Sequence, residues 1–573
     1  MSGGPQPHRL TRAQFDGVAA GGGEPDAIDV LRDAQVSKRL LLLRALRLST
    51  VLGSHPAWRV LDAAAAERPD TVRGVLSRPF VDLWATRALR AASAGSELPS
   101  GTERYLTGLT AAAALMADVP FEFAISGDAG PLVLPGLGRI DPVDAGVLSH
   151  RDGARIRWSG ATGATDIRPG DGTDQGGWWT AYRTVRYGDA TTGGEVELDD
   201  LDPHRSSYGL PAVDRLAPAA ARRWAELLRA ALTLVETELP VYWHTVRGCL
   251  RSVVPVTAPN AGTASASNQR AFGAVAVSVP ADADELALLL IHETQHAKLS
   301  ALLDLVDLVD PDDTQLFHAP WRTDPRPAGA LLQGSYAHAA VAGFWRIHRH
   351  SLAGAPARGA EFEHIFWRDQ ARVGADTLLA SRALTPLGRS FVERLAESLA
   401  GQVEPAHPAV SAAVSACATV TDMHWRLSNH AVLQAQTEAL AAAYRSGAPC
   451  PPLPLPQVRP GASRGAAMSE ALAQDIRRQA VDPAAPAGVS GVHVPSVAEL
   501  DRRLRADPAD TRAWALLALA LAGTGRERTS AALVQRPGLV RALAMGLPRA
   551  APSALADWLS TALPASAAAS GPH

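Results

Sequence analysis

The stretch that decides the fold, residues 282–303, reads DADELALLLIHETQHAKLSALL. Its apolar residues recur at the three- and four-residue spacing of a buried helix. Asp282, with Glu285 three residues later, fits the capping box that starts such a helix. The pattern therefore predicts a long, largely buried helix that begins after Asp282.

The middle of this predicted helix carries the string HETQH at residues 292–296. Histidines four residues apart lie on one helix face, so His292 and His296 can bind a single metal ion. Two imidazoles in an apolar helix would be costly to bury unless each is paired or ligated. We therefore expect a metal site here, and the spacing alone leaves zinc and iron both open. Glu293 is the candidate catalytic residue, either as a base or as a group that orients a ligand or water.

A metal site of this kind needs at least a third protein ligand. Residues 297–300 read AKLS and lack the Gly and His that extend the motif in metzincins, so the third ligand must lie further along the chain. The best candidate is His338, which ends LLQGSYAH at residues 331–338 and leads into a second apolar helix pattern. His318 and His348 are competitors, although His348 belongs to an arginine-rich run that favours a solvated face.

Two arginines precede His338 in WRTDPRP, residues 321–327. An arginine held between prolines suits a bidentate contact with a carboxylate. Arg322 and Arg326 are therefore candidate cofactor-binding residues, and the alternative is that they pair with Asp324.

The composition is that of a globular protein, with 47% hydrophobic and 20% charged residues and a net charge of −3. This charge disfavours nucleic acid and anionic membranes as partners, and no apolar run approaches the length of a spanning helix. The N-terminus lacks the apolar core of a signal peptide. The cysteines are scattered, without the spacing of a disulfide framework or a zinc knuckle, which is typical of a reducing, cytoplasmic setting. They are Cys249, Cys417 and Cys450.

The length of 573 residues predicts several domains. The fold class expected is mainly α with a β-rich segment (α+β), with a helical metal-binding core and a small helical C-terminal module. The predicted divisions are an N-terminal helical region at 1–118, a β-rich segment at 119–215, a helical HExxH domain at 216–447, a Pro/Ala-rich linker at 448–490 and a helical repeat-like module at 491–573.

Several separated motifs occur in order from residue 271 to 345. They are AFGAV at 271–275, HETQH at 292–296, LLDL at 302–305, PWR at 320–322, DPRP at 324–327 and GSYAH at 334–338. Together they resemble the HExxH-motif proteins of bacterial peptide-modification clusters. These are similar to 2-oxoglutarate-dependent, non-haem iron β-hydroxylases that act on ribosomally synthesised peptides.

The resemblance implies an iron(II) site with His292 and His296 as two ligands and His338 as the third. It implies that Arg322 or Arg326 holds the distal carboxylate of 2-oxoglutarate and that O2 is the second cosubstrate. The reaction implied is hydroxylation of a side-chain β-carbon in a precursor peptide during natural-product maturation. A further modifying enzyme of the same pathway is a second expected partner. Three histidines would depart from the usual two histidines and one carboxylate.

Three other interpretations stay open. The first is a zinc metallopeptidase with Glu293 as general base and Glu361 or Glu363 as a more distant ligand. The second is a di-iron bundle, because Glu293 with His296 and Glu361 with His364 form two ExxH pairs. The third is a helical scaffold that binds a partner through its C-terminal module. The tryptophans that are candidates for a peptide groove are Trp178, Trp179, Trp321, Trp345 and Trp425.

Overall fold

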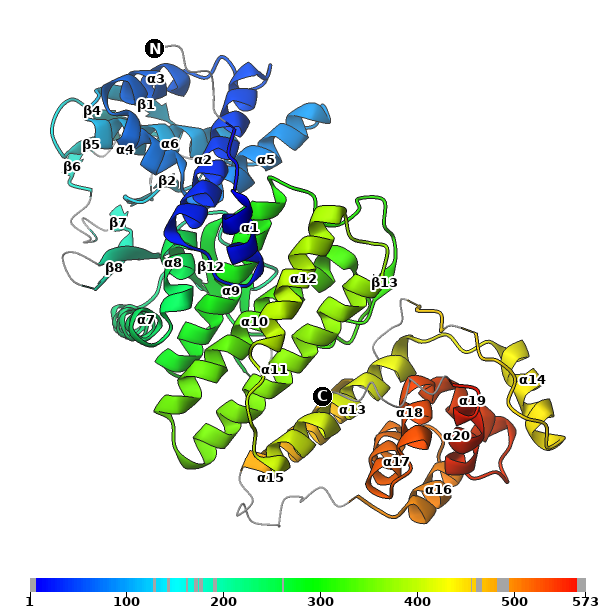
Figure 1. The fold of residues 1–573 in the computed structure, drawn as a ribbon. Helices are drawn as coiled ribbons and strands as arrows, with labels where there is room; N and C mark the ends of the chain where they lie inside the picture. Colours follow the sequence, from blue (N-terminus) through cyan, green and yellow to red (C-terminus); the bar gives the residue numbers. More distant parts are fainter. Residues whose placement is uncertain are drawn as a thin grey trace. The chain divides into compact units, whose positions relative to one another are not determined.

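The computed structural model describes residues 7–563, apart from short internal gaps, and is 58% helical with 12% in strands (Figure 1). The gaps are 127–129, 142–144, 161–162, 170–173, 175–178, 189–192, 260–261, 455, 460–465 and 482–493, and the side chains of 466–470 are also left out. These proportions confirm the predicted α+β class. The chain forms two compact units, Met1–Val306 and Asp307–His573, and each is described by itself. None of the described helices is long and apolar enough to cross a membrane.

The first unit begins with helices, as predicted for residues 25–118. They are α1 (Arg12–Ala19), α2 (Pro25–Leu48), α3 (Ala57–Glu67), α4 (Pro69–Leu76), α5 (Pro79–Ser93) and α6 (Thr102–Ala117). Helix α6 is buried along nearly its whole length. Gly108 lets it approach the backbone of strand β2 (Leu132–Leu134), because a Cβ there would lie 1.9 Å from the Val133 carbonyl oxygen. A close approach of this kind needs a residue without a side chain.

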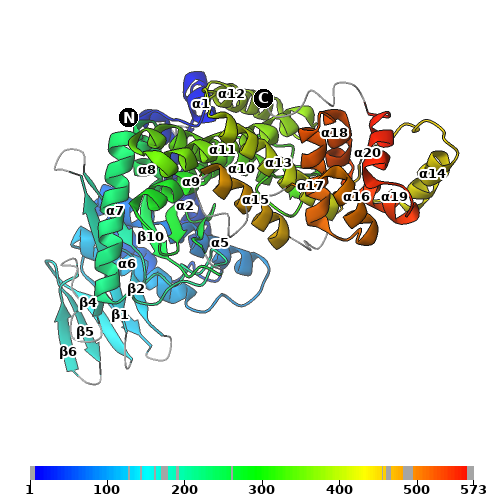
Figure 2. The ribbon, with the colours of Figure 1, turned by 90° about the horizontal axis from the view of Figure 1, so that it is seen from below.

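The predicted β-rich segment forms short strands. They are β1 (Phe121–Ile125), β2 (Leu132–Leu134), β3 (Gly138–Ile140), β4 (Gly146–His150), β5 (Ile156–Gly160), β6 (Gly163–Ile167), β7 (Trp179–Ala181), β8 (Arg183–Tyr187) and β9 (Gly194–Leu198). An antiparallel sheet has the order β1-β4-β5-β6, and a second has the order β2-β3-β7. Figure 2 shows β4, β5 and β6 side by side. Burial alternates along β1, so one face of this sheet packs on the core.

A third sheet, of order β11-β12-β10-β9-β8, supports the motif helix. Its later strands are β10 (Leu250–Pro255), β11 (Ser265–Ser267) and β12 (Gly273–Val277), and the helices around it are α7 (Pro218–Glu238), α8 (Pro240–Cys249) and α9 (Ala283–Leu303). Strand β10 runs parallel to both β9 and β12. Every residue of β12 is buried, as expected for a strand covered on both faces.

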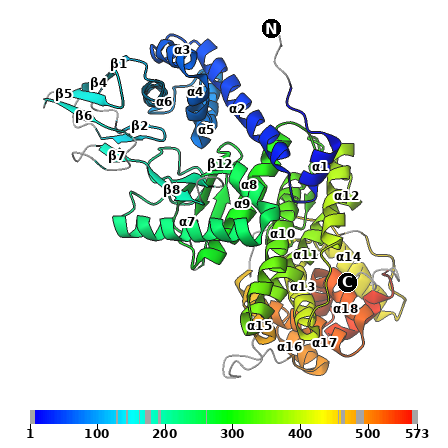
Figure 3. The same ribbon diagram turned by 60° about the vertical axis from the view of Figure 1, so that its left-hand side comes forward.

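Helix α9 packs against α2, α7, α8, β11 and β12 within the first unit (Figure 3). Its N-cap is Asp282, whose carboxylate accepts a hydrogen bond from the Glu285 backbone N–H at 2.9 Å. The Glu285 carboxylate accepts from the Ala281 N–H instead of the Asp282 N–H. The predicted cap is thus confirmed, while the reciprocal bond of the capping box is shifted by one residue.

The second unit is helical. Its elements are β13 (Leu316–Phe317), β14 (Arg326–Pro327), α10 (Ala328–His348), the 3-10 turn η2 (Arg349–Ser351), α11 (Gly354–Ala380), α12 (Pro386–Ala400), α13 (Pro408–Asn429), α14 (Gln434–Arg445) and α15 (Ala466–Val481). Helices α10 and α11 pack side by side along their length (Figure 3). Gly374 allows the close approach, because a Cβ there would lie 2.2 Å from the Ser335 hydroxyl.

The predicted C-terminal module is helical. It consists of α16 (Val497–Ala506), α17 (Thr511–Gly523), α18 (Glu527–Gln535), α19 (Pro537–Gly546) and α20 (Pro552–Ser560). Helices α13 and α15 pack against α17 around Trp514, which is fully buried. The proline-rich stretch from Cys450 is irregular in the residues described, apart from one bridge between His430 and Val458.

Substitution of Asp282 tests whether its side chain stabilises the start of α9. We expect Asp282→Ala to lower the free energy of unfolding by about 1 kcal/mol, because the Glu285 N–H loses its acceptor. Asp282→Asn keeps an acceptor oxygen and should stay close to the wild type. Urea unfolding followed by circular dichroism measures both variants. Equal losses in the two variants would show that the charge, and not the cap, is responsible.

Candidate metal centre

His292 and His296 converge on one face of α9. Their Nε2 atoms lie 3.2 Å apart, and the ring planes are nearly perpendicular at 84°. Two nitrogens that each bind a metal at about 2.0–2.1 Å, at roughly tetrahedral or octahedral angles, lie roughly 2.9–3.4 Å apart. The observed spacing therefore fits a single metal ion held between the two rings.

The surroundings favour the neutral, metal-binding form of His292. Burial lowers its pKa to about 4, the neighbouring His296 lowers it further, and Glu293 opposes the shift. A histidine must be neutral to present a lone pair to a metal, so His292 is ready to bind across the physiological range. Both imidazoles are half-buried, while the residues between them are buried.

Glu293 is buried and tied to the neighbouring sheet. Its carboxylate accepts a hydrogen bond from the Ser265 hydroxyl of β11 at 2.7 Å. A general base for zinc-bound water has to face that water, whereas this carboxylate is held toward a strand. The geometry therefore suits the orienting role better than the role of a base.

Two further polar residues of α9, Gln295 and Lys298, are fully buried. The Gln295 amide and the Lys298 ammonium both donate to the Gly21 carbonyl at 3.0 Å, and Lys298 also donates to the Gly22 carbonyl. Burial lowers the pKa of Lys298 to about 7. These bonds fasten the segment after α1 to the motif helix. The sequence analysis did not identify this role, although Lys298 is one of only two lysines in the chain.

His338 lies on α10, in the second unit. Its Nδ1 lies 2.8 Å from the Gly334 carbonyl oxygen, so Nδ1 carries the proton and Nε2 carries the lone pair. This is the tautomer that a metal-binding histidine uses, with its other nitrogen fixed by a backbone carbonyl. The ring is stacked between Trp321 at 4.5 Å and Trp367 at 4.4 Å. Its placement relative to the histidine pair of α9 stays a prediction.

Arg322 and Arg326 both pair with Asp324, at 3.0 Å each. The alternative considered from the sequence is thus present in this structure. The side chains of Arg322 and Arg326 are 49% and 33% exposed, so a ligand could reach either guanidinium group. Arg322 lines a cavity and Arg326 does not, which distinguishes two residues that the sequence could not separate.

The cavity beside Arg322 has a volume of about 360 Å³ and lies wholly within the second unit. Its walls carry five large aromatic side chains, those of Trp321, Phe362, Phe366, Trp367 and Trp425, together with polar residues that include the ion pair of Glu363 with Arg477. Two of these, Trp321 and Trp367, are the rings that enclose His338. An apolar hollow with a few polar groups is the usual form of a ligand site.

The predicted tryptophan groove is correct only in part. Trp321 and Trp425 line this cavity, whereas Trp179 is 1% exposed and packs in the core of the first unit. Trp345 packs on Phe344 at the end of α10 and is not part of the lining. Trp178 lies outside the described residues. Trp367, which the sequence analysis did not select, follows Phe366 on α11 and faces His338.

The competing histidines have other partners. His318 pairs with Asp422 at 3.2 Å and stacks on Trp425. His348 is 4% exposed and packs on Phe344, so the expectation of a solvated face is wrong there. The end of α10 turns this side chain inward, while its neighbours Arg346 and Arg349 both pair with Glu404.

The second ExxH pair does not form a metal site. Both ring nitrogens of His364 face backbone carbonyl oxygens, those of Ala342 at 3.0 Å and Gln402 at 3.2 Å. Glu361 accepts from the backbone N–H of His407. Because His364 and Glu361 already have structural hydrogen-bond partners, the second ExxH pair that the di-iron interpretation requires is not supported.

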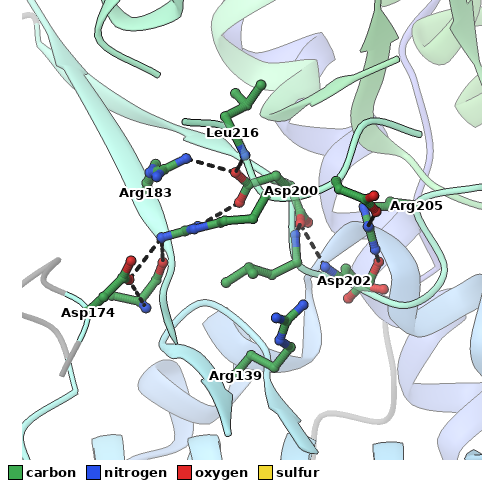
Figure 4. Close-up of polar contacts among 12 residues, drawn as sticks. Arg139, Asp174, Arg183, Asp200, Asp202, Arg205 and Leu216 are labelled. Atoms are coloured by element: carbon green, nitrogen blue, oxygen red, sulfur yellow. Dashed lines mark hydrogen bonds and ion pairs between the residues drawn. The ribbon is translucent and has the colours of Figure 1, made fainter. Parts of the chain in front are cut away.

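The first unit contains a separate cluster of buried acids that the sequence analysis missed, in the string DDLD at 199–202. Asp200 accepts from Arg183 at 2.9 Å and from Arg215 at 2.6 Å, and its charge is therefore compensated (Figure 4). Asp199 accepts the backbone N–H groups of 201 and 202. The Asp202 carboxylate accepts from the Tyr105 hydroxyl at 3.1 Å and from the His204 backbone N–H at 2.8 Å, whereas Arg205 donates to the Asp202 backbone carbonyl and not to the carboxylate. The sequence signal that could have indicated this cluster is the presence of three acids within four residues directly after a strand.

Burial raises the pKa of Asp202, and the adjacent Asp199 raises it further. The pKa of Asp199 is raised for the same first reason. A raised pKa in the folded state means that the native protein binds more protons than the unfolded chain over the intervening pH range. The cluster therefore stabilises the fold most at low pH, and this contribution declines as the pH rises.

Among the described residues, no group of three or more His, Cys, Asp or Glu side chains is gathered closely enough to hold a metal ion. The chain matches no protein-family model and no curated protein sequence. The resemblance to the HExxH peptide-modification proteins, and the ligand set that it implies, therefore stay predictions.

The acid cluster predicts a measurable pH dependence. Because burial beside Asp199 raises the pKa of Asp202 to about 8 from the ordinary value of 3.8, its contribution to stability should be present below about pH 4 and lost as the pH rises toward 8. Asp202→Asn cannot ionise and should flatten this part of the curve, making the variant more stable than the wild type above pH 8. Urea unfolding across the pH range measures the effect.

The matched control for this measurement is Asp152→Asn, an exposed carboxylate of the same unit. We expect it to follow the wild-type curve. An Asp202→Asn curve parallel to that of the wild type would show that this carboxylate is ionised in the folded protein.

Proposed function

We propose that this protein is an iron(II)- and 2-oxoglutarate-dependent dioxygenase that hydroxylates a side-chain β-carbon of a ribosomally synthesised peptide. The observation that carries the proposal is the 3.2 Å separation of the His292 and His296 Nε2 atoms, which suits one metal ion. The choice of reaction rests on the resemblance of residues 271–345 to the HExxH peptide-modification proteins.

In this proposal His292 and His296 bind the metal from α9, and His338 is the third ligand. The tautomer of His338 supports this assignment, because its Nδ1 contact with Gly334 directs the lone pair to Nε2. Bound iron would supply the activation of O2. One oxygen atom enters the new C–OH group and the other enters succinate, while 2-oxoglutarate loses CO2. In this proposal the hydrogen bond between Glu293 and Ser265 fixes α9 against β11 and so orients the two histidines, and Glu293 takes no proton from the substrate.

The aromatic cavity of the second unit supports a peptide as the substrate. A peptide offers apolar side chains to aromatic walls, and the buried N–H of Trp425, which has no hydrogen-bond partner among the described residues, offers a donor to a backbone carbonyl. Arg322 at the rim would meet a carboxylate, which suits the 2-oxoglutarate anchor. The precursor peptide is therefore the proposed partner, and the C-terminal module is a candidate contact for a further modifying enzyme.

The first test is anaerobic reconstitution with Fe(II) followed by 2-oxoglutarate, read by visible absorption. A weak charge-transfer band is expected when the cosubstrate chelates the iron. His292→Ala and His296→Ala should each lose stoichiometric metal and the band, because either change leaves a single imidazole on α9. His244→Ala, an exposed histidine of α8, is the matched control.

The same measurement decides between the hydroxylase and the zinc peptidase. Stoichiometric zinc in the purified protein, no band with iron, and peptide cleavage that is lost in Glu293→Gln would replace the proposal by the peptidase. A band that survives in His338→Ala with full metal content would show that the third ligand is another residue.

The two arginines give a separate prediction. Arg322→Gln should raise the 2-oxoglutarate concentration needed for half-maximal signal by roughly ten- to hundredfold, as for loss of a charge-assisted contact. Arg326→Gln, which is outside the cavity lining, serves as the matched comparison and should change it much less. Titration of the charge-transfer band measures both, and the reverse order would make Arg326 the anchor.

A further inference from the structure

The proposed function uses the cavity of the second unit, and it does not use a separate cavity that lies in the first unit. It has a volume of about 320 Å³, and its walls come from α2, α4, the junction of α8 with β10, and the start of β12. None of its lining residues belongs to α9, which carries the histidine pair. This volume lies at the small end of ligand pockets, which span about 300–1,000 Å³.

The walls of this cavity are rich in arginine. Four arginines line it, against two acids, Asp33 and Asp70; from outside the lining, Asp29 pairs with Arg32 at 2.9 Å and Glu197 lies 3.7 Å from Arg251. The four are Arg32, Arg39, Arg73 and Arg251. Arg39 is the lining arginine for which no carboxylate partner is found among the described residues, and low-dielectric walls strengthen the positive potential of such a charge.

Arg39 is a buried arginine in the wall of this cavity. It is 2% exposed, and its Nη2 donates to the Phe272 carbonyl at 2.7 Å. Its Nε has no hydrogen-bond partner among the described residues. Burial lowers its pKa to about 10, Asp82 opposes the shift, and Arg251 adds to it. The nearby acid Asp82 already pairs with Lys38 at 3.1 Å.

A buried cation that has no carboxylate in hydrogen-bond contact is costly to keep in a folded core. A structure can lower this cost by binding an anion beside it. The fold places Arg39 on the wall of a cavity, where such an anion has room. A surface residue would need no such compensation, because water would solvate its charge.

The other arginines are positioned to complete a site. Arg251 is anchored at one end, where its Nη1 donates to the Gly74 carbonyl at 3.1 Å and to the Ser77 hydroxyl at 2.9 Å. Arg73 pairs only loosely with Asp33, at 3.5 Å, and is 47% exposed. A guanidinium group presents several donors in a rigid fork, which matches the geometry of a phosphate or carboxylate group.

We propose that this cavity binds a compact oxyanion, a phosphate group or a carboxylate group, between Arg39, Arg73 and Arg251. The oxyanion compensates the buried charge of Arg39 and accepts hydrogen bonds from the guanidinium groups. The cavity is thereby a ligand site of the first unit, separate from the metal centre proposed on α9.

Isothermal titration calorimetry of the full chain, free of metal, tests the site with inorganic phosphate and, separately, with succinate. Saturable one-to-one binding of at least one probe is expected, weakening as the salt concentration rises. The probe that binds more tightly identifies the source of the oxyanion as a phosphate or a carboxylate group. Absence of saturable binding with both probes overturns the proposal.

The variants assign the binding to this cavity. Arg73→Gln and Arg39→Met should each weaken binding by roughly tenfold or more. Asp33→Asn should strengthen it, because it removes a negative charge and releases Arg73. Arg44→Gln, an exposed arginine of the same helix outside the lining, is the matched control and should bind as the wild type does.

Wild-type affinity in both Arg73→Gln and Asp33→Asn would overturn the proposal even if Arg39→Met fails to fold. Circular dichroism checks the fold of each variant. His292→Ala should keep its anion affinity, so a failure of the metal centre and a failure of this site give different results.

Discussion

The polar side chains of α9 impose the constraint on which the first unit depends. This helix lies inside the fold and carries a glutamate, a glutamine and a lysine that are at most 4% exposed. Each needs a partner, because an unpaired polar group in a core costs about as much as a lost hydrogen bond or more. Glu293 accepts from Ser265, and Lys298 and the Gln295 amide N–H donate to the Gly21 carbonyl, while the Gln295 Oε1 has no hydrogen-bond partner among the described residues. Strand β11 and the segment after α1 are thereby held against one helix.

The histidine pair lies on the same helix, between and beside these bonded residues. His292 and His296 stay half-buried, and their nitrogens converge at the spacing of metal ligands. Because the residues between them are committed to the neighbouring elements, the two rings are presented on a rigid support. Sites on rigid elements hold their geometry more closely than sites on loops.

The first unit contains other buried charged residues, which differ in whether an oppositely charged partner lies at hydrogen-bond distance. Asp200 is compensated by two arginines, so it is structural. Asp202 lacks such a partner at hydrogen-bond distance, and its raised pKa follows from burial beside another acid. Arg39 lacks a bonded carboxylate and borders a cavity. Compensated charges serve the fold, whereas uncompensated ones mark places where a proton or a ligand can bind.

The sequence by itself determined what depends on neighbours along the chain. The α+β class, the N-cap of α9 at Asp282 and the four-residue spacing of His292 and His296 all follow from local periodicity. Only the tertiary structure decided which distant groups meet: Ser265 at Glu293, Trp367 at His338, and the burial of His348. These contacts join residues on different elements, and their pairing depends on how whole helices and strands pack. The physical reason is that hydrogen bonds within a helix are set by its geometry, whereas the partner of a buried side chain is set by the fold around it.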